Sequence, residues 1–143
     1  MIRATPTSFG LPDWCAAWLS WRMKPYHRLE AWQKAHAFAV AVHLETRGFP
    51  PDERYGLTSQ LRRAAFSVAA NIVEGSGKRG PREFGRFLDI ALGSMPEVTY
   101  ALEYAQGVGY LTDDRYQVLE ALRNEAGVLL WFLYKKVRGA KSG

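Results

Sequence analysis

Residues 55–79 read YGLTSQLRRAAFSVAANIVEGSGKR. Apolar residues recur along this stretch at steps of three and four, which is the spacing of one helix face. They are Leu57, Leu61, Ala64, Ala65, Val68 and Ile72. A second apolar row, made of Phe66, Ala69 and Val73, lies on another side. Because a surface helix needs only one apolar stripe, the two rows predict the central helix of a bundle that also packs against another subunit.

A helix is predicted before this stretch, over residues 29–47. Gly48, Pro50 and Pro51 follow it and end it, because glycine and proline are stop signals for a helix. Six residues of this helix recur at helical spacing and lie on one side of it: Leu29, Trp32, His36, Ala39, Val40 and His43.

Two more helices are predicted after the central one. The first starts at Pro81, a favourable first-turn residue, and closes at Gly107 and Gly109. Pro96 removes a backbone hydrogen bond inside it, which predicts a kink near residues 92–96. Its apolar seam is Phe84, Leu88, Ala91, Met95, Val98, Leu102 and Ala105. The second has Thr112 as its N-cap. Its seam is Tyr116, Leu119, Leu122, Ala126, Leu129, Leu133 and Val137.

Four amphipathic helices joined by short connections predict an all-α fold, an antiparallel up-down-up-down four-helix bundle over residues 23–138. Residues 139–143 are expected to form a frayed tail. Residues 1–22 carry scattered Pro, Gly and Trp without a sustained period, so a poorly ordered extension is expected there. One hypothesis is that translation starts at Met23; the alternative is an amphipathic segment whose tryptophans dock on the bundle.

Composition fits one globular domain of 143 residues. The net charge of +5 favours a polyanionic partner. A single cysteine, Cys15, excludes an intramolecular disulfide and fits a cytoplasmic protein. No apolar run approaches the roughly 20 residues of a membrane span.

Motifs for catalysis, metals or cofactors are not found. The Glu-x-x-His pairs of di-iron bundles are absent from the sequence. His36 and His43 lie two helical turns apart, too far for one metal ion. The Gly75–Gly80 loop departs from the P-loop pattern, since Arg79 follows Lys78. We therefore expect no enzyme activity, no catalytic residues, no metal and no cofactor.

Two polar sets stand out against the apolar pattern. Arg63, Asn71 and Glu74 lie along the central helix, and a buried structural polar network is favoured over a catalytic or ligand site. A basic set gathers around the end of that helix and the start of the next. Because arginine holds phosphate bidentately, this set is the candidate nucleic-acid-binding surface, with a merely solvated face as the alternative. It consists of Arg62, Lys78, Arg79, Arg82 and Arg86.

Several short motifs resemble those of the bacterial four-helix bundle protein family. They include Leu29–Ala35, Tyr55–Ala65, Asn71–Gly75 and Ile90–Ser94. This family includes proteins encoded in intervening sequences of large-subunit ribosomal RNA genes, and more distantly the accessory variability determinant of diversity-generating retroelements. The resemblance covers about residues 26–137. Ser94-Met95-Pro96-Glu97 departs from the common Ser-Leu-Ala-Glu pattern.

The resemblance implies a homo-oligomer, a pentameric ring, with a basic surface that binds nucleic acid, and no catalytic residues. We therefore expect a non-enzymatic oligomeric bundle that binds RNA or DNA, RNA above all. The alternative is a protein-interaction scaffold that recruits a protein partner such as a reverse transcriptase. No membrane role is expected.

Overall fold

The computed structural model describes residues 25–140. The expectations for residues 1–22, including a start at Met23, lie outside the described residues. A short 3-10 helix, η1 (Pro25–Arg28), precedes α3 (Glu30–Glu45). The 3-10 turns η2 (Thr46–Gly48) and η3 (Pro51–Glu53) lead to α4 (Leu57–Ser76). The chain continues through α5 (Gly80–Gly107) and α6 (Asp113–Gly139).

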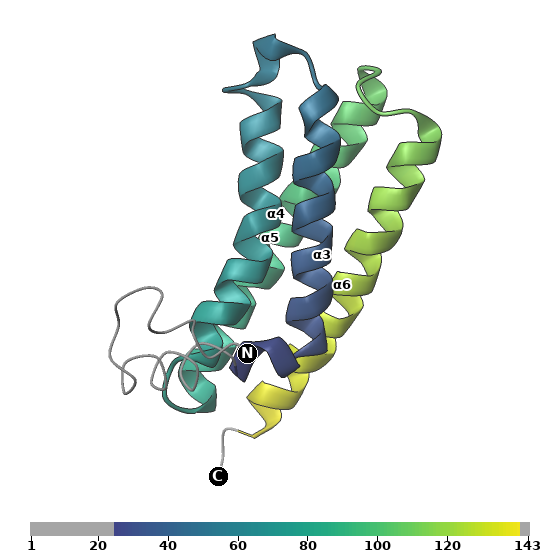
Figure 1. The fold of residues 1–143 in the computed structure, drawn as a ribbon. Coiled ribbons are helices and arrows are strands. Elements are labelled where there is room, and N and C mark those ends of the chain that lie inside the picture. Colours follow the sequence, from purple (N-terminus) through teal and green to yellow (C-terminus); the bar gives the residue numbers. More distant parts are fainter. Residues whose placement is uncertain (1–24, 141–143) are drawn as a thin grey trace, which may run out of the picture.

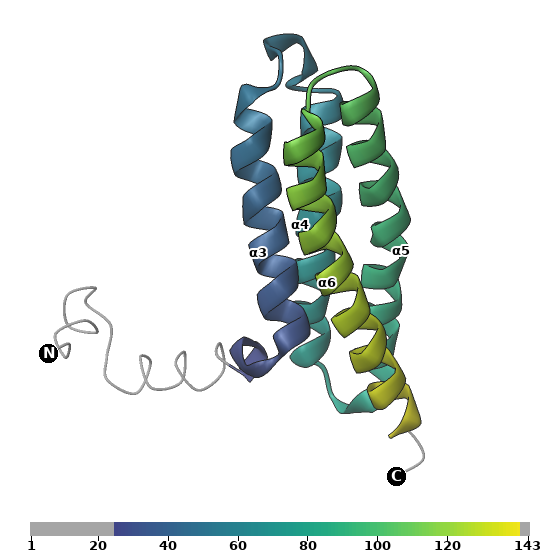
Figure 2. The same ribbon diagram turned by 90° about the vertical axis from the view of Figure 1, so that its right-hand side faces the viewer.

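These four long helices form the predicted up-down-up-down bundle (Figure 1). Neighbouring pairs pack in a closed circuit: α3 on α4, α4 on α5, α5 on α6 and α6 on α3. The α3–α4 and α5–α6 connections lie at one end (Figures 1 and 2). The α4–α5 connection, η1 and the end of α6 lie at the other. No strand is present among residues 25–140.

The first apolar row of α4 faces the core, as predicted. Its members are all buried: Leu57, Leu61, Ala64, Ala65, Val68 and Ile72. The second row divides, because Ala69 is buried, Val73 is half-buried and Phe66 is 67% exposed. Phe66 is thus the member of that row that faces solvent and can contact another molecule.

The row noted on α3 faces the core only in part, because Leu29, Trp32 and Ala39 are half-buried against it. The buried side of α3 is a neighbouring stripe: Ala31, Ala35, Phe38 and Val42. His36, Val40 and His43 are exposed on the outer side, beside α4. The buried stripe contains Phe38 and Val42, whereas the noted row contains His36 and His43, so the more hydrophobic stripe is the buried one.

The expected features of the last two helices are largely present. Leu88, Ala91, Val98, Leu102 and Ala105 of α5 are fully buried. Helix α5 continues through Pro96 without interruption, and the bend there stays a prediction. The Thr112 hydroxyl accepts a hydrogen bond from the Arg115 amide at 3.2 Å, which confirms the predicted N-cap of α6.

Candidate nucleic-acid interface

The α4–α5 connection is positioned by a close approach of the two helices. A Cβ atom on Gly75 would lie 2.8 Å from the Phe87 Cβ and 2.9 Å from the Phe84 Cδ1, so only glycine fits there without displacement. Gly80, with φ +78°, adopts a left-handed conformation that favours glycine and starts α5. These glycines set the place of Lys78 and Arg79 relative to the first turns of α5.

Two predicted basic residues meet over one aromatic ring. The Lys78 Nζ lies 5.3 Å and the Arg86 Cζ 4.5 Å from the centroid of the Phe87 ring, which is itself buried. Glu74 approaches Lys78 at 4.0 Å, and Glu83 contacts Arg86 at 3.3 Å. Such exposed ion pairs contribute little stability, so a phosphate group can replace the carboxylates at small cost.

A further arginine reaches this surface from the far end of the chain. The Arg138 side chain of α6 lies against Gly85 of α5, where an added Cβ would be 2.8 Å from the Arg138 Cδ. Gly85 is in the same helical turn as Arg82 and Arg86. The last turn of α6 therefore joins the surface formed by the α4–α5 connection.

We call this end of the bundle the basic end, defined by residues 25–30, 74–90 and 132–140. It carries eight basic and four acidic side chains. The opposite end, residues 45–63 and 97–123, carries six basic and eight acidic ones. Helix α4, with 20 residues, is about 30 Å long, well beyond the screening distance of about 8 Å at physiological salt. The two ends therefore present separate potentials of opposite sign.

Arg62 does not lie with the other four basic residues. Its Nε donates a hydrogen bond to the Thr46 hydroxyl at 2.7 Å, and its guanidinium also donates to the His43 carbonyl oxygen at 3.3 Å. Thr46 closes α3 at the opposite end, about 20 Å along α4 from the basic end. The predicted cluster was wrong in this member, because Arg62 joins α4 to the end of α3.

The predicted network of Arg63, Asn71 and Glu74 does not form. Asn71 instead donates to the Ser67 carbonyl oxygen at 2.8 Å and to its hydroxyl at 3.0 Å. The Ser67 hydroxyl lies 3.0 Å from the Ser94 hydroxyl, which links α4 to α5. Arg63 and Glu74 are exposed. Asn71 therefore belongs to a polar contact between α4 and α5. Because its side chain bonds to Ser67 and the other two are exposed, the three residues do not form one site.

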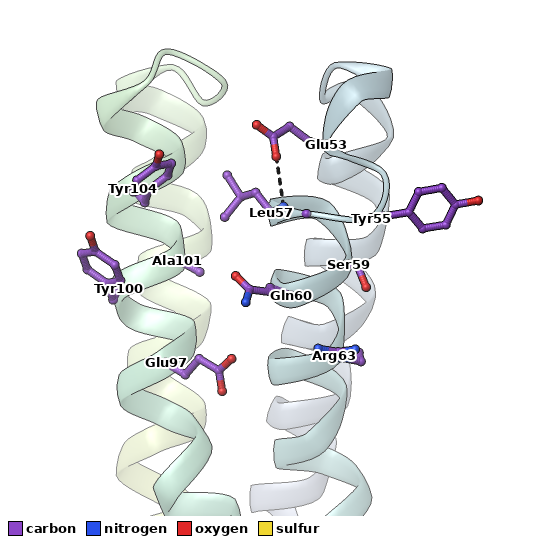
Figure 3. A pocket seen from close by; sticks show the side chains of 11 residues that line it. Glu53, Tyr55, Leu57, Ser59, Gln60, Arg63, Glu97, Tyr100, Ala101 and Tyr104 are labelled. Carbon is purple, nitrogen blue, oxygen red and sulfur yellow. Dashed lines mark hydrogen bonds between the residues drawn. The ribbon is translucent and has the colours of Figure 1, made fainter.

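Two hollows flank α4 on its outer side. A groove of about 550 Å³ between α3 and α4 is lined mainly by apolar atoms, with Phe66, Val40 and Leu44 exposed in it. A pocket of about 450 Å³ lies between α4 and α5 (Figure 3). Gln60 and Glu97 extend into it from its two sides, whereas Tyr55 points away (Figure 3). Asn71 and Glu74 line neither hollow.

The resolved pKa shifts have structural causes at the opposite end. A hydrogen bond to Glu53 raises the pKa of the Tyr110 phenol, and burial raises that of Tyr116. A hydrogen bond to Glu120 raises the pKa of Arg123. Within residues 25–140, no group of three or more His, Cys, Asp or Glu side chains is placed to hold a metal ion. No helix in this part of the chain is long and apolar enough to cross a membrane.

Residues 27–131 match the 23S rRNA-intervening sequence protein family. The chain belongs to this family. Among solved structures, it is similar to a protein of unknown function from the S23 ribosomal protein family of Bacteroides thetaiotaomicron VPI-5482. The two are 27% identical with a TM-score of 0.66, over 73% of this chain and 95% of the other. No curated protein matches.

The match to the family ends at residue 131 and so leaves out part of the basic end. Lys135 and Arg138 lie beyond it, in the last turns of α6. From the sequence, these residues were not assigned to the candidate nucleic-acid-binding surface. The up-down topology was the available signal, because it brings the end of the fourth helix beside the start of the third.

Proposed function

We propose that this chain is a non-enzymatic bundle that self-associates and binds nucleic acid, RNA above all, through its basic end. The observation that carries the proposal is the gathering of Lys78, Arg79, Arg82 and Arg86 with Arg138 at one end of the bundle. Membership in a family described by ribosomal RNA intervening sequences supports RNA as the polyanion.

Binding through this end is mainly electrostatic. The basic side chains come from two helices and the connection between α4 and α5. Such a surface follows the phosphate backbone and has little sequence preference. A closed ring of copies, the pentamer that we propose, repeats the basic end around its axis and multiplies the number of phosphate contacts.

Self-association is proposed to use the α3–α4 groove. Phe66 is 67% exposed there, and Leu44 is 52% exposed. An apolar surface of this kind is typical of contacts between protein chains. A second copy is the occupant that agrees with the family resemblance, and a different protein partner is the alternative.

The experiment is a comparison of two charge-reversed variants of equal net charge. R82E/R86E alters the basic end, and the control R47E/R54E alters two exposed arginines at the opposite end. Anisotropy of a labelled RNA hairpin at low salt should show at least about tenfold weaker binding for the first variant. The control should bind as the unmodified protein does. Equal binding by all three proteins would contradict the proposal.

A further inference from the structure

The last turns of α6 carry large aromatic side chains that the core does not use. The α6 side chains buried in this half of the bundle are Ala126, Leu130 and Val137. Trp131 is 48% exposed and Phe132 is 63% exposed. Val128, one turn earlier, is exposed beside them. Val128, Trp131 and Phe132, within two turns of α6, thus present an apolar and largely aromatic surface to solvent.

Basic side chains lie one helical turn beyond two rings of this part of α6. The Lys135 Nζ lies 5.8 Å from the centroid of the Trp131 ring. The Arg138 Cζ lies 5.7 Å from the Tyr134 ring, and Tyr134 stacks beside Trp131 at 5.7 Å with an interplanar angle of 25°. Trp131 and Tyr134 therefore each have a cation next to them. The Tyr134 contact also restrains the orientation of the Trp131 ring.

This α6 surface, formed by Trp131, Phe132, Lys135 and Arg138, overlaps the basic end, which includes residues 132–140. Arg138 contacts both Tyr134 on its own helix and Gly85 on α5, between Arg82 and Arg86. Figure 2 shows the end of α6 descending past the start of α5. A chain of phosphates that leaves Arg82 and Arg86 can pass Arg138 and continue along α6 toward Lys135.

We infer that this α6 surface binds unpaired nucleotides, with bases stacked on Trp131 and Phe132 and phosphates held by Lys135 and Arg138. This inference rests on the proposed function and adds the class of nucleic acid. A base in a single strand offers its face to an aromatic side chain, whereas a base in a duplex is already stacked on its neighbours. A ring with a cation beside it, as in the Trp131–Lys135 pair, fits a base and its neighbouring phosphate.

Charge complementarity favours this occupant over a protein surface. An apolar partner seated on Trp131 and Phe132 would also cover Lys135 and remove its ammonium group from water, which is costly without an anionic partner. A nucleotide supplies that anion next to each base. A protein or a second copy is therefore treated as an outcome of the test.

The test measures binding of a labelled oligouridylate and of a labelled RNA duplex of the same length to the full chain. W131A and F132A should each weaken oligouridylate binding about tenfold and leave duplex binding unchanged within about twofold. W131F, which keeps an aromatic ring, should restore most of the affinity. The matched control is Y100A on α5, which removes a 65% exposed aromatic ring outside this surface.

Other results overturn the inference in distinguishable ways. If W131A and F132A bind oligouridylate normally while R82E/R86E still weakens duplex binding, the α6 site is wrong and the proposed function stands. Equal weakening of both RNAs would exclude a stacking role. A change of particle mass in light scattering would make the α6 surface a contact between copies. If the unmodified protein binds neither RNA, both proposals fail.

Discussion

Gly75 of α4 lies so close to Phe87 of α5 that a Cβ atom on Gly75 would be 2.8 Å from the Phe87 Cβ. This contact lets the two helices meet immediately before the α4–α5 connection. The Phe87 ring, held in place there, has Lys78 and Arg86 beside it. The packing of two helices and the arrangement of the candidate interface therefore depend on the same pair of residues.

Replacing Gly75 by alanine should destabilise the bundle. The added methyl group would overlap Phe87 and Phe84, and overpacking of this kind costs about 1–3 kcal/mol. The free energy of unfolding from chemical denaturation measures the effect. Gly93→Ala is the control, because a Cβ there meets nothing within 4 Å and should stabilise α5 by about 0.5–1 kcal/mol. An equal increase in the free energy of unfolding for Gly75→Ala and Gly93→Ala would contradict close packing at Gly75.

Replacing Pro96 by alanine should stabilise the protein. Pro96 lies in the interior of α5, is exposed, and cannot donate the backbone hydrogen bond of its position. Alanine restores that donor, and the gain is at most about 3 kcal/mol. Denaturant titration of both proteins measures it. A less stable Pro96→Ala protein would mean that the fold requires the bend expected at this residue.

Phe66→Ser should reduce the size of the assembly without unfolding the chain. The side chain is mostly exposed, so the effect on the isolated fold should stay within about 0.5 kcal/mol. Light scattering should show a mass below that of the proposed pentamer of 16.2 kDa chains. Tyr55→Ser, at an 87% exposed position outside the groove, serves as the control. An unchanged mass for Phe66→Ser would remove the groove from the subunit contact.

Stability should fall at alkaline pH, in part because of Tyr110. Its hydroxyl donates to the Glu53 carboxylate at 2.9 Å, and this bond raises the pKa of the phenol in the folded state. The hydrogen bond stabilises the folded state at pH values below the pKa of the phenol in the unfolded chain, about 10. This stabilisation is lost as the pH rises through the higher pKa of the folded state. Tyr110→Phe should lower the midpoint of thermal unfolding at neutral pH and weaken its decline above about pH 10. If the unfolding midpoints of both proteins fall in parallel with pH, Tyr110 does not contribute to the alkaline loss of stability.

The sequence predicted the helices well because each has a strong period and clear end signals. The row of α4 from Leu57 to Ile72 is buried as expected, and Thr112 caps α6. The inner side of α3 was harder to identify. Its buried residues Ala31 and Ala35 have weak hydrophobicity, whereas the larger Trp32 is only half-buried and Val40 is exposed. The buried Phe38 and Val42 were not included in the predicted row, although they lie on the same side as these alanines.

The candidate interface was predicted only in part. Lys78 and Arg86 could be grouped because they are near in sequence and flank one connection. Arg62 was placed there wrongly, since its bond to Thr46 depends on how α3 and α4 pack. Arg138 was missed because its contact with Gly85 joins two residues that are far apart in the chain, at the end of α6 and the start of α5. Contacts of this kind depend on three-dimensional packing and not on local sequence pattern.

The salt dependence of RNA affinity tests the central claim most directly. The logarithm of the association constant of the unmodified protein should fall linearly with the logarithm of salt concentration, with a slope set by the number of phosphate contacts. R82E/R86E should make that slope shallower by about 2, one for each lost contact, while R47E/R54E should leave it unchanged. An affinity that does not vary with salt, or identical slopes for all three proteins, would contradict binding through the basic end.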